Sequence, residues 1–248
     1  MSLAPIPPHP KLARYYARDE ERPGLVSEMF DAGAPYYEWV CRVMSLGTGE
    51  RYRRHALAEA GLGEGMRILD IAAGTGLVLR SAIALCGDEG LAIGLDPSRG
   101  MLRECRRACA APLLQGRGEL LPFPSACFDM VSLGYGLRHM ADLHAFFGEC
   151  RRVLKPGGRL LLLEITQPRS PLGRRLNRLY LRNLVPIVAR MATGAMAARR
   201  MMDYFWDTIE RCVPPEVILK ALRASGFAEA TRKVRGGVLS AYLATKER

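Results

Sequence analysis

A short segment of small residues between two carboxylates carries the clearest chemical signal in this sequence. Residues 70–76 read Asp-Ile-Ala-Ala-Gly-Thr-Gly, and Asp96 follows 20 residues after Gly76. Glycines let a ligand approach the backbone closely, and the first N–H groups of a following helix bind polar ligand atoms. A carboxylate at the position of Asp96 can hold both hydroxyls of a ribose. The segment therefore predicts a turn that binds a nucleoside.

Two nucleoside cofactors compete for this turn. A nicotinamide dinucleotide needs the pattern G-x-G-x-x-G, which Gly74 and Gly76 begin but Leu79 does not complete. Asp70 precedes the turn, and a carboxylate repels a pyrophosphate but attracts the ammonium group of S-adenosylmethionine. The charge favours S-adenosylmethionine over the dinucleotide, and a tight turn without a ligand is the third interpretation.

Apolar runs and helical patterns alternate around this turn. Strands are expected at 66–71, 91–95, 112–115, 128–133 and 159–166, and helices at 77–86, 98–110 and 141–154. Such alternation is typical of βαβ units and a parallel sheet. Segments 227–234 and 238–245 predict an antiparallel closing pair, and Lys155-Pro156-Gly157-Gly158 predicts a type II turn.

Helical segments are expected to surround this α/β core. Residues 1–24, rich in proline and charge, predict a loose N-terminal arm. Residues 25–64 predict N-terminal helices over the active site, broken at 47–49 by Gly-Thr-Gly. The core spans 65–248 and contains a helical cap inserted at about 170–212, and 214–225 predicts one more helix.

Composition limits the classes of protein to which the chain can belong. With 49% hydrophobic and 25% charged residues it is neither collagen, coiled coil nor disordered. The sequence contains no run of about 18 apolar residues, so it predicts no membrane-spanning helix. The N-terminus lacks the pattern of a secretory signal. Seven scattered cysteines without a C-x-x-C pair predict no disulfide framework and no metal site, which favours a reducing cytoplasm.

The net charge of +11 indicates an anionic partner, such as nucleic acid, a lipid surface or an acidic substrate. Between Ile165 and Met202 there is no acidic residue, but there are eight arginines: Arg169, Arg174, Arg175, Arg178, Arg182, Arg190, Arg199 and Arg200. Leucines lie on another face of the same predicted helix. The segment is interpreted as a solvated helix, a helix lying on anionic lipid, or a site for an anionic acceptor.

Several motifs together resemble those of one known family. They are Ile68-Leu69-Asp70-Ile71-Ala72-Ala73-Gly74-Thr75-Gly76, Leu121-Pro122-Phe123-Pro124, Phe128-Asp129, Tyr135-Gly136-Leu137-Arg138, the run from Arg152 to Arg159, and Leu163-Glu164. Residues 25–245 resemble the ubiquinone/menaquinone-biosynthesis C-methyltransferases, the UbiE type of class I S-adenosylmethionine-dependent methyltransferases. Gly136-Leu137-Arg138 and the pattern Tyr37…Met44-Ser45-x-Gly47 are the motifs most specific to this quinone branch.

The resemblance implies a Rossmann-like, seven-stranded, mostly parallel sheet with helices on both faces and a helical cap over the acceptor. S-adenosylmethionine would lie at the carboxyl ends of the strands, with Asp96 on the ribose, Arg117 and Gly118 along the adenine, and Gly134 near the sulfonium. Tyr37, Arg138 and His139 would line the acceptor site. The complete predicted cofactor set is Asp70, Ala72, Gly74, Thr75, Gly76, Asp96, Pro97, Met101, Arg117, Gly118, Glu119 and Gly134.

The departures from the family pattern lie mainly on the acceptor side. The family usually has Asn where this chain has His139, and Asn-Asp where it has Cys41-Arg42. Arg117 stands in place of the usual acid or Asn beside the adenine. These differences leave methyl transfer in place but put the quinone substrate itself in question.

Methylation of a phenol carbon requires that the ring oxygen lose its proton. Ionising a phenol of pKa about 10 at pH 7 costs about 4 kcal/mol, at about 1.36 kcal/mol per unit. A charged hydrogen bond from Arg138 contributes about 1.5–3 kcal/mol, so a base is also needed. His139 is the predicted base, whereas His9, His55 and His144 are interpreted as surface or core residues.

The sequence thus predicts a methyltransferase for a hydrophobic, aromatic small molecule, with carbon as first choice of acceptor atom and oxygen or nitrogen as second. An anionic lipid or isoprenoid diphosphate is the alternative acceptor. The non-enzymatic alternative is an accessory or nucleic-acid-binding protein that keeps the fold, although no nucleic acid is expected. A cytoplasmic protein is expected, with peripheral membrane contact through the arginine-rich segment and a homodimer left open.

Overall fold

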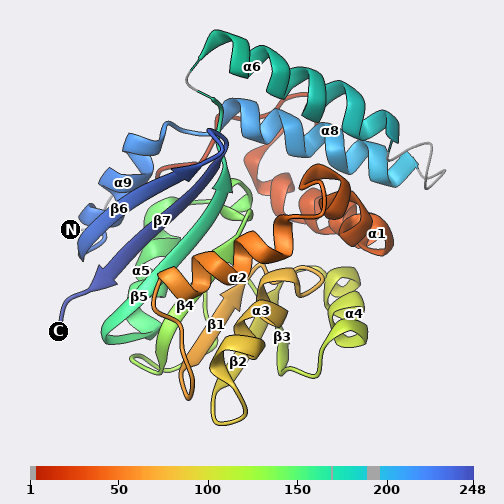
Figure 1. Ribbon diagram of the computed structural model, residues 1–248. Coiled ribbons are helices and arrows are strands. Elements are labelled where there is room, and N and C mark those ends of the chain that lie inside the picture. The colour runs from red at the N-terminus through yellow and green to blue at the C-terminus, as the bar shows by residue number, and fades with distance from the viewer. Residues whose placement is uncertain (1–3, 169, 189–195) are drawn as a thin grey trace.

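The computed structural model describes residues 4–168, 170–188 and 196–248, and within them seven strands form one sheet. The strands are β1 (Arg67–Ile71), β2 (Leu91–Asp96), β3 (Leu113–Gln115), β4 (Phe128–Gly134), β5 (Leu154–Ile165), β6 (Phe227–Arg235) and β7 (Leu239–Lys246). Their order is β3-β2-β1-β4-β5-β7-β6 (Figure 1). The first five are parallel, and β7 is antiparallel to β5 and β6. The predicted mostly parallel sheet and its antiparallel pair are confirmed.

Helices cover both faces of this sheet and the edge at which the parallel strands end. They are η1 (Asp19–Glu21), α1 (Arg22–Met44), α2 (Gly49–Glu59), α3 (Leu77–Cys86), α4 (Arg99–Ala108), η2 (Leu137–His139), α5 (Leu143–Val153), α6 (Pro171–Arg178), the π-helix η3 (Leu179–Leu184), α8 (Met196–Arg211) and α9 (Pro215–Ala224). In Figure 1, α6, α8 and α1 lie together above the sheet. None of the described helices is both long and apolar enough to span a bilayer.

Consecutive leucines in β5 show how both faces of the sheet are filled. Leu160 and Leu162 pack in the cluster that contains side chains of α5 and α9. Leu161 and Leu163 pack in the other cluster, with side chains of α2 and α3. Side chains alternate between the faces of a strand, so a continuous apolar run is what a strand covered on both faces requires.

The N-terminal arm is not loose, and this expectation is wrong. The backbone N–H of Val213 donates to the carbonyl oxygen of Pro8 at 2.8 Å, and that of Leu143 donates to Ile6 at 2.9 Å. Leu12 and Tyr16 are buried in a cluster with α1, α4 and α8. A few well-placed apolar side chains and backbone hydrogen bonds therefore fix a segment whose proline and charge content suggested disorder.

Two local expectations are modified by the structure. The predicted turn at 155–158 lies inside β5, where the pairing of β4 with β5 shifts register. Gly157 has a φ of +75°, the left-handed conformation that the third position of a type II turn requires. The predicted cap is helical in α6, η3 and α8, while Arg169 and Arg190 lie outside the described residues.

Candidate active site

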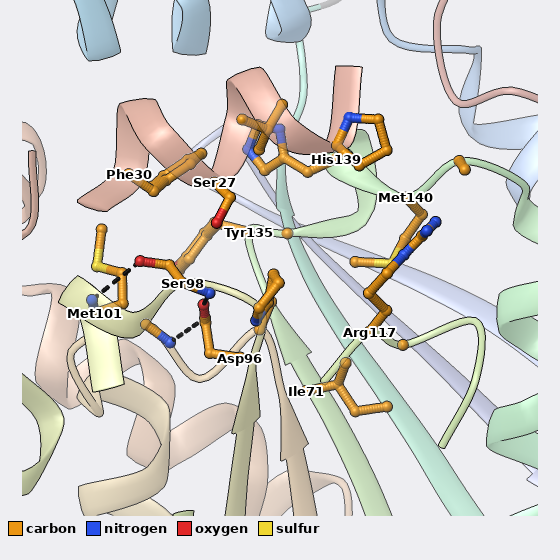
Figure 2. A pocket seen from close by; sticks show the side chains of 18 of the residues that line it. Ser27, Phe30, Ile71, Asp96, Ser98, Met101, Arg117, Tyr135, His139 and Met140 are labelled. Carbon is orange, nitrogen blue, oxygen red and sulfur yellow. Dashed lines mark hydrogen bonds between the residues drawn. The ribbon is translucent and has the colours of Figure 1, made fainter. Parts of the chain in front are cut away.

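A cavity of about 290 Å³ lies between the carboxyl ends of β1, β2 and β4 and the covering helix α1. Figure 2 shows Ile71 and Asp96 on the strand side of this cavity and Phe30 and His139 opposite them. The predicted site residues in its wall are Tyr37, Ala72, Gly74, Asp96, Pro97, Met101, Arg117, Gly118, Glu119, Gly134 and His139. The structure therefore brings most of the predicted cofactor residues and two of the three predicted acceptor residues into one space.

Asp96 organises the strand side of the cavity. Its Oδ2 accepts a hydrogen bond from the backbone N–H of Gly74 at 2.8 Å, and its Oδ1 accepts one from Ser98 at 2.8 Å (Figure 2). Gly74 can turn toward Asp96 because it has a φ of +58°, which glycine adopts without strain. Burial raises the pKa of Asp96 to about 6.

The start of α4 is attached to α1 beside Asp96. The Ser98 side chain caps α4 by accepting from the backbone N–H of Met101 at 3.0 Å. Its hydroxyl in turn donates to Oδ1 of Asp31 at 2.5 Å, and the N–H of Gly100 donates to the same oxygen at 2.7 Å. One carboxylate of α1 therefore fixes the covering helix relative to the loop that carries Asp96.

Asp70, Thr75 and Gly76 lie behind the wall of the cavity rather than on it. Asp70 faces Ser132 across the β1–β4 pair and accepts its hydroxyl hydrogen bond at 2.7 Å. Burial raises the pKa of Asp70 to about 7. Asp70 Oδ2 and Thr75 Oγ1 have no hydrogen-bond partner among the described residues, so the predicted contact of these three residues with the cofactor stays a prediction.

His139 lies at the opposite side, among aromatic rings. Its ring centroid is 5.1 Å from that of Phe30, 5.6 Å from Tyr204 and 6.5 Å from Phe205. Neither ring nitrogen has a hydrogen-bond partner among the described residues. Burial, and then the charge of Arg138, hold the pKa of His139 well below its usual value. The imidazole is therefore neutral, and its predicted role as a base stays a prediction.

Tyr37 lies in the cavity wall between the two sides. Its ring centroid is 6.3 Å from that of Phe30, and a Cβ on Gly74 would lie 3.8 Å from its Cε1. Burial raises the pKa of Tyr37 well above its usual value, so the phenol keeps its proton. Tyr37 can therefore pack against a ligand or donate a hydrogen bond, but it cannot act as a base.

Arg138 does not line the cavity, and its predicted place in the acceptor site is wrong. The side chain is fully buried, and its Nε donates to Oε2 of Glu164 at 2.9 Å. Its Nη1 donates to the Thr208 hydroxyl at 2.8 Å and its Nη2 to the carbonyl oxygen of Tyr135 at 3.1 Å. The guanidinium ties η2 to β5 and α8. Glu164, at the end of the strand next to β4, was the sequence signal for this pairing.

The N-terminal arm, α1 and α8 bring further residues to the cavity that the sequence does not predict as site residues. They are Pro7, His9, Lys11, Arg22, Pro23, Val26, Ser27, Phe30 and Phe205. The helical pattern does place Val26 and Phe30 on the apolar face of their helix. No local pattern marks His9 or Arg22, because their position depends on how the arm packs.

Comparison with known proteins assigns this chain to a family. The model of the ubiE/COQ5 methyltransferase family matches residues 16–246. The chain belongs to this family. It is accordingly an S-adenosylmethionine-dependent methyltransferase, as the sequence predicts.

Relatives of similar length support the assignment. A demethylmenaquinone methyltransferase of Symbiobacterium thermophilum is 32% identical over 239 residues, which cover 92% of this chain and 95% of the relative. A protein named ubiquinone/menaquinone biosynthesis C-methyltransferase UbiE from Geobacter sulfurreducens is 32% identical over 235 residues, covering 91% and 90%. A demethylmenaquinone methyltransferase of Deinococcus radiodurans is 34% identical over 234 residues, covering 92% and 95%.

Solved structures share the fold at lower identity. A methyltransferase from Thermotoga maritima, described as a possible histamine N-methyltransferase, has a TM-score of 0.63 at 19% identity and covers 90% of this chain and all of that one. Phosphoethanolamine N-methyltransferase 2 of Haemonchus contortus, solved with S-adenosyl-L-methionine, has a TM-score of 0.61 at 15% identity and covers 88% and 57%. These matches confirm the predicted class I methyltransferase fold.

Proposed function

We propose that this enzyme transfers a methyl group from S-adenosylmethionine to a ring carbon of a hydrophobic quinol or phenol. The observation that carries the proposal is that Asp96 and His139 line opposite sides of the same cavity, and that aromatic rings surround His139. Two of the relatives are named for demethylmenaquinone, a substrate of this chemical class.

The strand side of the cavity fits the methyl donor. Each carboxylate oxygen of Asp96 accepts one backbone hydrogen bond, which leaves lone pairs for the two ribose hydroxyls. With a pKa of about 6, Asp96 is mainly ionised at neutral pH. Pro97 and Met101 supply apolar contacts for the adenine, and Gly134 leaves room near the sulfonium. When bound, S-adenosylmethionine supplies a methyl group on a positively charged sulfur.

The opposite side of the cavity fits an aromatic acceptor. Phe30, Phe205 and the neutral ring of His139 form a wall against which a flat ring can pack. Bound S-adenosylmethionine would supply its methyl group to the ring carbon, which would then lose its hydrogen as a proton to solvent. The enzyme therefore mainly orients the reactants and helps the ring oxygen to ionise.

A base must take the proton of the ring hydroxyl. His139 is the base that the sequence predicts, and its two unpaired nitrogens allow this role. Its lowered pKa makes it a weak base, so a cation near the ring oxygen is required as well. Arg138 does not line the cavity, and its guanidinium donates hydrogen bonds to Glu164, Thr208 and Tyr135, so it does not donate one to the ring oxygen.

The proposal is tested by incubating the enzyme with isotope-labelled S-adenosylmethionine and a panel of reduced demethylated naphthoquinones, benzoquinols and simple phenols. Mass spectrometry then locates the new methyl group. We expect a methyl on a ring carbon of a quinol, and a His144→Ala variant should behave as wild type because His144 lies outside the cavity wall. Methyl found only on oxygen or nitrogen, or no product with any aromatic acceptor, would refute the proposal.

An isoprenoid diphosphate or anionic lipid is a second candidate acceptor. It is favoured by three cationic side chains in the cavity wall, those of Lys11, Arg22 and Arg117. Geranyl diphosphate and phosphatidylglycerol therefore belong in the same panel. Label in either of them, and none in the quinols, would select this candidate.

A further inference from the structure

Two polar side chains in the cavity wall have no role in the function proposed so far. His9 of the N-terminal arm is 2% exposed, and Arg22 at the start of α1 is 6% exposed. Both line the cavity that contains His139. Buried polar groups are nearly always hydrogen-bonded, so atoms of such residues that lack a partner next to a cavity point to a ligand.

Each of these side chains has one such atom. His9 Nδ1 is 2.8 Å from the carbonyl oxygen of Pro10, whereas His9 Nε2 has no partner among the described residues. Arg22 donates through Nη2 to the carbonyl oxygen of Arg138 at 2.7 Å, whereas its Nε has no partner there. Each residue thus has one buried nitrogen without a hydrogen-bond partner, and the Arg138 carbonyl and the Tyr204 hydroxyl also lie near His9 and Arg22, respectively.

The chemistry of the two unused nitrogens is complementary. A carbonyl oxygen can only accept, so Nδ1 of His9 carries the hydrogen and Nε2 carries a lone pair. Arg22 Nε always carries a hydrogen and can only donate. One acceptor and one donor, on residues that line the same cavity, match a hydroxyl group, which donates one hydrogen bond and accepts others.

The charges favour a hydroxyl that can ionise. Arg22 forms no ion pair with any carboxylate of the described residues, so it is a buried cation without a counter-charge. Burial, and then the charge of Arg22, lower the pKa of His9 to about 4, so both His9 and His139 are neutral. The cluster therefore has one positive charge, which an aryl oxide would balance.

We propose that His9 and Arg22 form the binding site for the ring hydroxyl of the acceptor, with His9 as the group that takes its proton. This inference rests on the proposed function. Arg22 Nε–H donates to the ring oxygen, and the oxygen–hydrogen bond breaks as a new nitrogen–hydrogen bond forms at His9 Nε2. The negative charge then lies beside Arg22, and the ring carbon becomes nucleophilic.

His139 has a different part in this arrangement. No hydrogen bond fixes either of its nitrogens, whereas the Pro10 carbonyl fixes the ring of His9 in one tautomer. The fixed orientation of its ring makes His9 the better-placed proton acceptor, while Arg22 lowers the basicity of His9 and stabilises the aryl oxide that forms. His139 then packs against the plane of the acceptor ring, and once the product returns to the phenol form, the proton on His9 goes back to the ring oxygen.

The experiment uses a nitrophenol, whose ionised form absorbs visible light, bound to the enzyme that is saturated with S-adenosylhomocysteine. We expect bound nitrophenol to ionise at least one pH unit below free nitrophenol, and Arg22→Gln to remove most of this shift. Lys11, His139 and Arg138 also carry titratable or charged groups near this site. Lys11→Gln should therefore be measured beside Arg22→Gln, and it should retain the shift.

Variants of His9 separate positioning from proton transfer. His9→Gln retains a hydrogen-bond acceptor but no base, so we expect KM near wild type with kcat lowered at least 100-fold. His9→Ala should also raise KM, and His144→Ala should change neither. No ionisation shift in the wild type, or normal kcat in His9→Gln, would overturn the site.

The result that would refute the proposed function differs from the result that would refute the site formed by His9 and Arg22. If the enzyme does not bind S-adenosylhomocysteine or does not methylate any quinol, the proposed function is refuted. In that case a nitrophenol shift that disappears in Arg22→Gln still supports an aryl-oxide site, and absence of the shift refutes that site too.

The cap carries a second and independent inference. Six of the nine large apolar side chains that the structure describes as exposed lie in or next to the cap, namely Leu172, Leu176, Leu179, Leu184, Ile187 and Met196. The first three, at 68%, 57% and 58% exposure, follow a helical spacing along α6 and into η3. In Figure 1 α6 lies at the outer edge of the molecule, above α8.

This apolar surface is surrounded by positive charge. Arg175 and Arg182 are exposed on the same helical segment, and the sequence between Ile165 and Met202 has no acidic residue, although Glu210 of α8 pairs with Arg182 at 4.0 Å and with Arg178. A second copy of the chain would bring two such positive faces together, which the charge opposes. Exposed leucines beside arginines instead match an anionic lipid surface, into which the apolar face inserts.

We propose that the outer face of α6 and η3 docks on an anionic membrane. The same cap contributes Phe205 to the cavity, so docking places the active site next to the lipid that dissolves a hydrophobic acceptor. The proposal does not depend on which acceptor the enzyme uses.

Vesicle flotation tests this docking. We expect binding to phosphatidylcholine vesicles that contain phosphatidylglycerol, weaker binding to pure phosphatidylcholine, and loss with rising salt. Leu172→Ser/Leu176→Ser/Leu179→Ser should abolish binding, whereas Leu46→Ser/Leu120→Ser, equally exposed elsewhere, should not. Arg175→Glu should weaken binding more than fivefold and Arg103→Glu on α4 should not. Equal binding of the triple variant, or a dimer by light scattering that the triple variant dissociates, would overturn the proposal.

Discussion

At the Asp96 end of the cavity most of the lining comes from one stretch, residues 71–119, whereas the His139 end combines the N-terminal arm, α1, η2 and α8. The first end depends on local rules, such as strand ends, glycine turns and a capped helix. The second depends on tertiary packing, since His9 and Phe205 come from segments near opposite ends of the sequence. The comparison shows why the cofactor side of this site can be inferred from local motifs, whereas the acceptor side depends on how distant segments pack.

The largest effect on catalysis is expected at the His139 end of the cavity. His9→Ala should lower kcat by about 10²–10⁴-fold, because a positioned base contributes that much, and His139→Ala should lower kcat less. Affinity for S-adenosylhomocysteine should stay within about twofold in both variants. Steady-state kinetics and calorimetry measure these quantities. A cofactor affinity that falls together with kcat would mean that the two ends are not separate.

The next effect concerns Arg138, which ties η2 to β5 and α8. Arg138→Met leaves Glu164 buried without its partner, which should lower the free energy of unfolding by about 3–5 kcal/mol. Urea denaturation measures this loss, and Arg138→Met/Glu164→Gln should recover part of it.

A stable Arg138→Met variant with a raised KM for the acceptor would contradict this account. It would restore Arg138 to the acceptor site that the sequence predicted, and the guanidinium would have to move from its interior contacts to reach it.

A smaller effect is expected at the Asp96 end of the cavity. Asp96→Asn should weaken binding of S-adenosylhomocysteine by about 10–100-fold, because charged hydrogen bonds contribute about 1.5–3 kcal/mol. Nitrophenol binding at the other end should not change. Calorimetry with both ligands checks the pair of results, and unaltered nucleoside affinity would remove Asp96 from the ribose site.

The smallest effect concerns Asp70, behind the cavity wall. Its pKa is raised to about 7 in the folded state, so the stability present when it is protonated is lost as the pH rises through 7. Between pH 6 and 8 this loss is about 1 kcal/mol and is absent in Asp70→Asn. The melting temperature of Asp70→Asn should therefore rise relative to wild type by about 2–4 °C over that range. A difference that does not depend on pH would show that Asp70 is not protonated near neutrality.

Much of the fold can be predicted from the sequence, because the residues that begin and end helices and strands act locally. The helix predicted at 77–86 has these bounds in α3, where Gly76 and Gly87 at its two ends have positive φ. The arm could not be predicted, because two buried residues, Leu12 and Tyr16, decide its position against a background of proline and charge. The π-helix η3 has no sequence signal that we can identify.

The candidate site divides in the same way. Asp96, Gly74 and Met101 lie in the cavity wall as predicted, since the turn and strand ends are set by neighbours in sequence. Arg138 could be located only by knowing that β5 lies next to β4, and His9 only by knowing where the arm packs. Such contacts between distant segments are a property of the folded chain.

A crystal structure of the enzyme with S-adenosylhomocysteine and a nitrophenol tests the central claim most directly, namely that one cavity holds donor and acceptor at opposite sides. The account predicts the ribose hydroxyls on Asp96 and the phenol oxygen between His9 and Arg22, with the sulfur directed toward the phenol ring. A nucleoside away from Asp96, or a phenol outside this cavity, would contradict it.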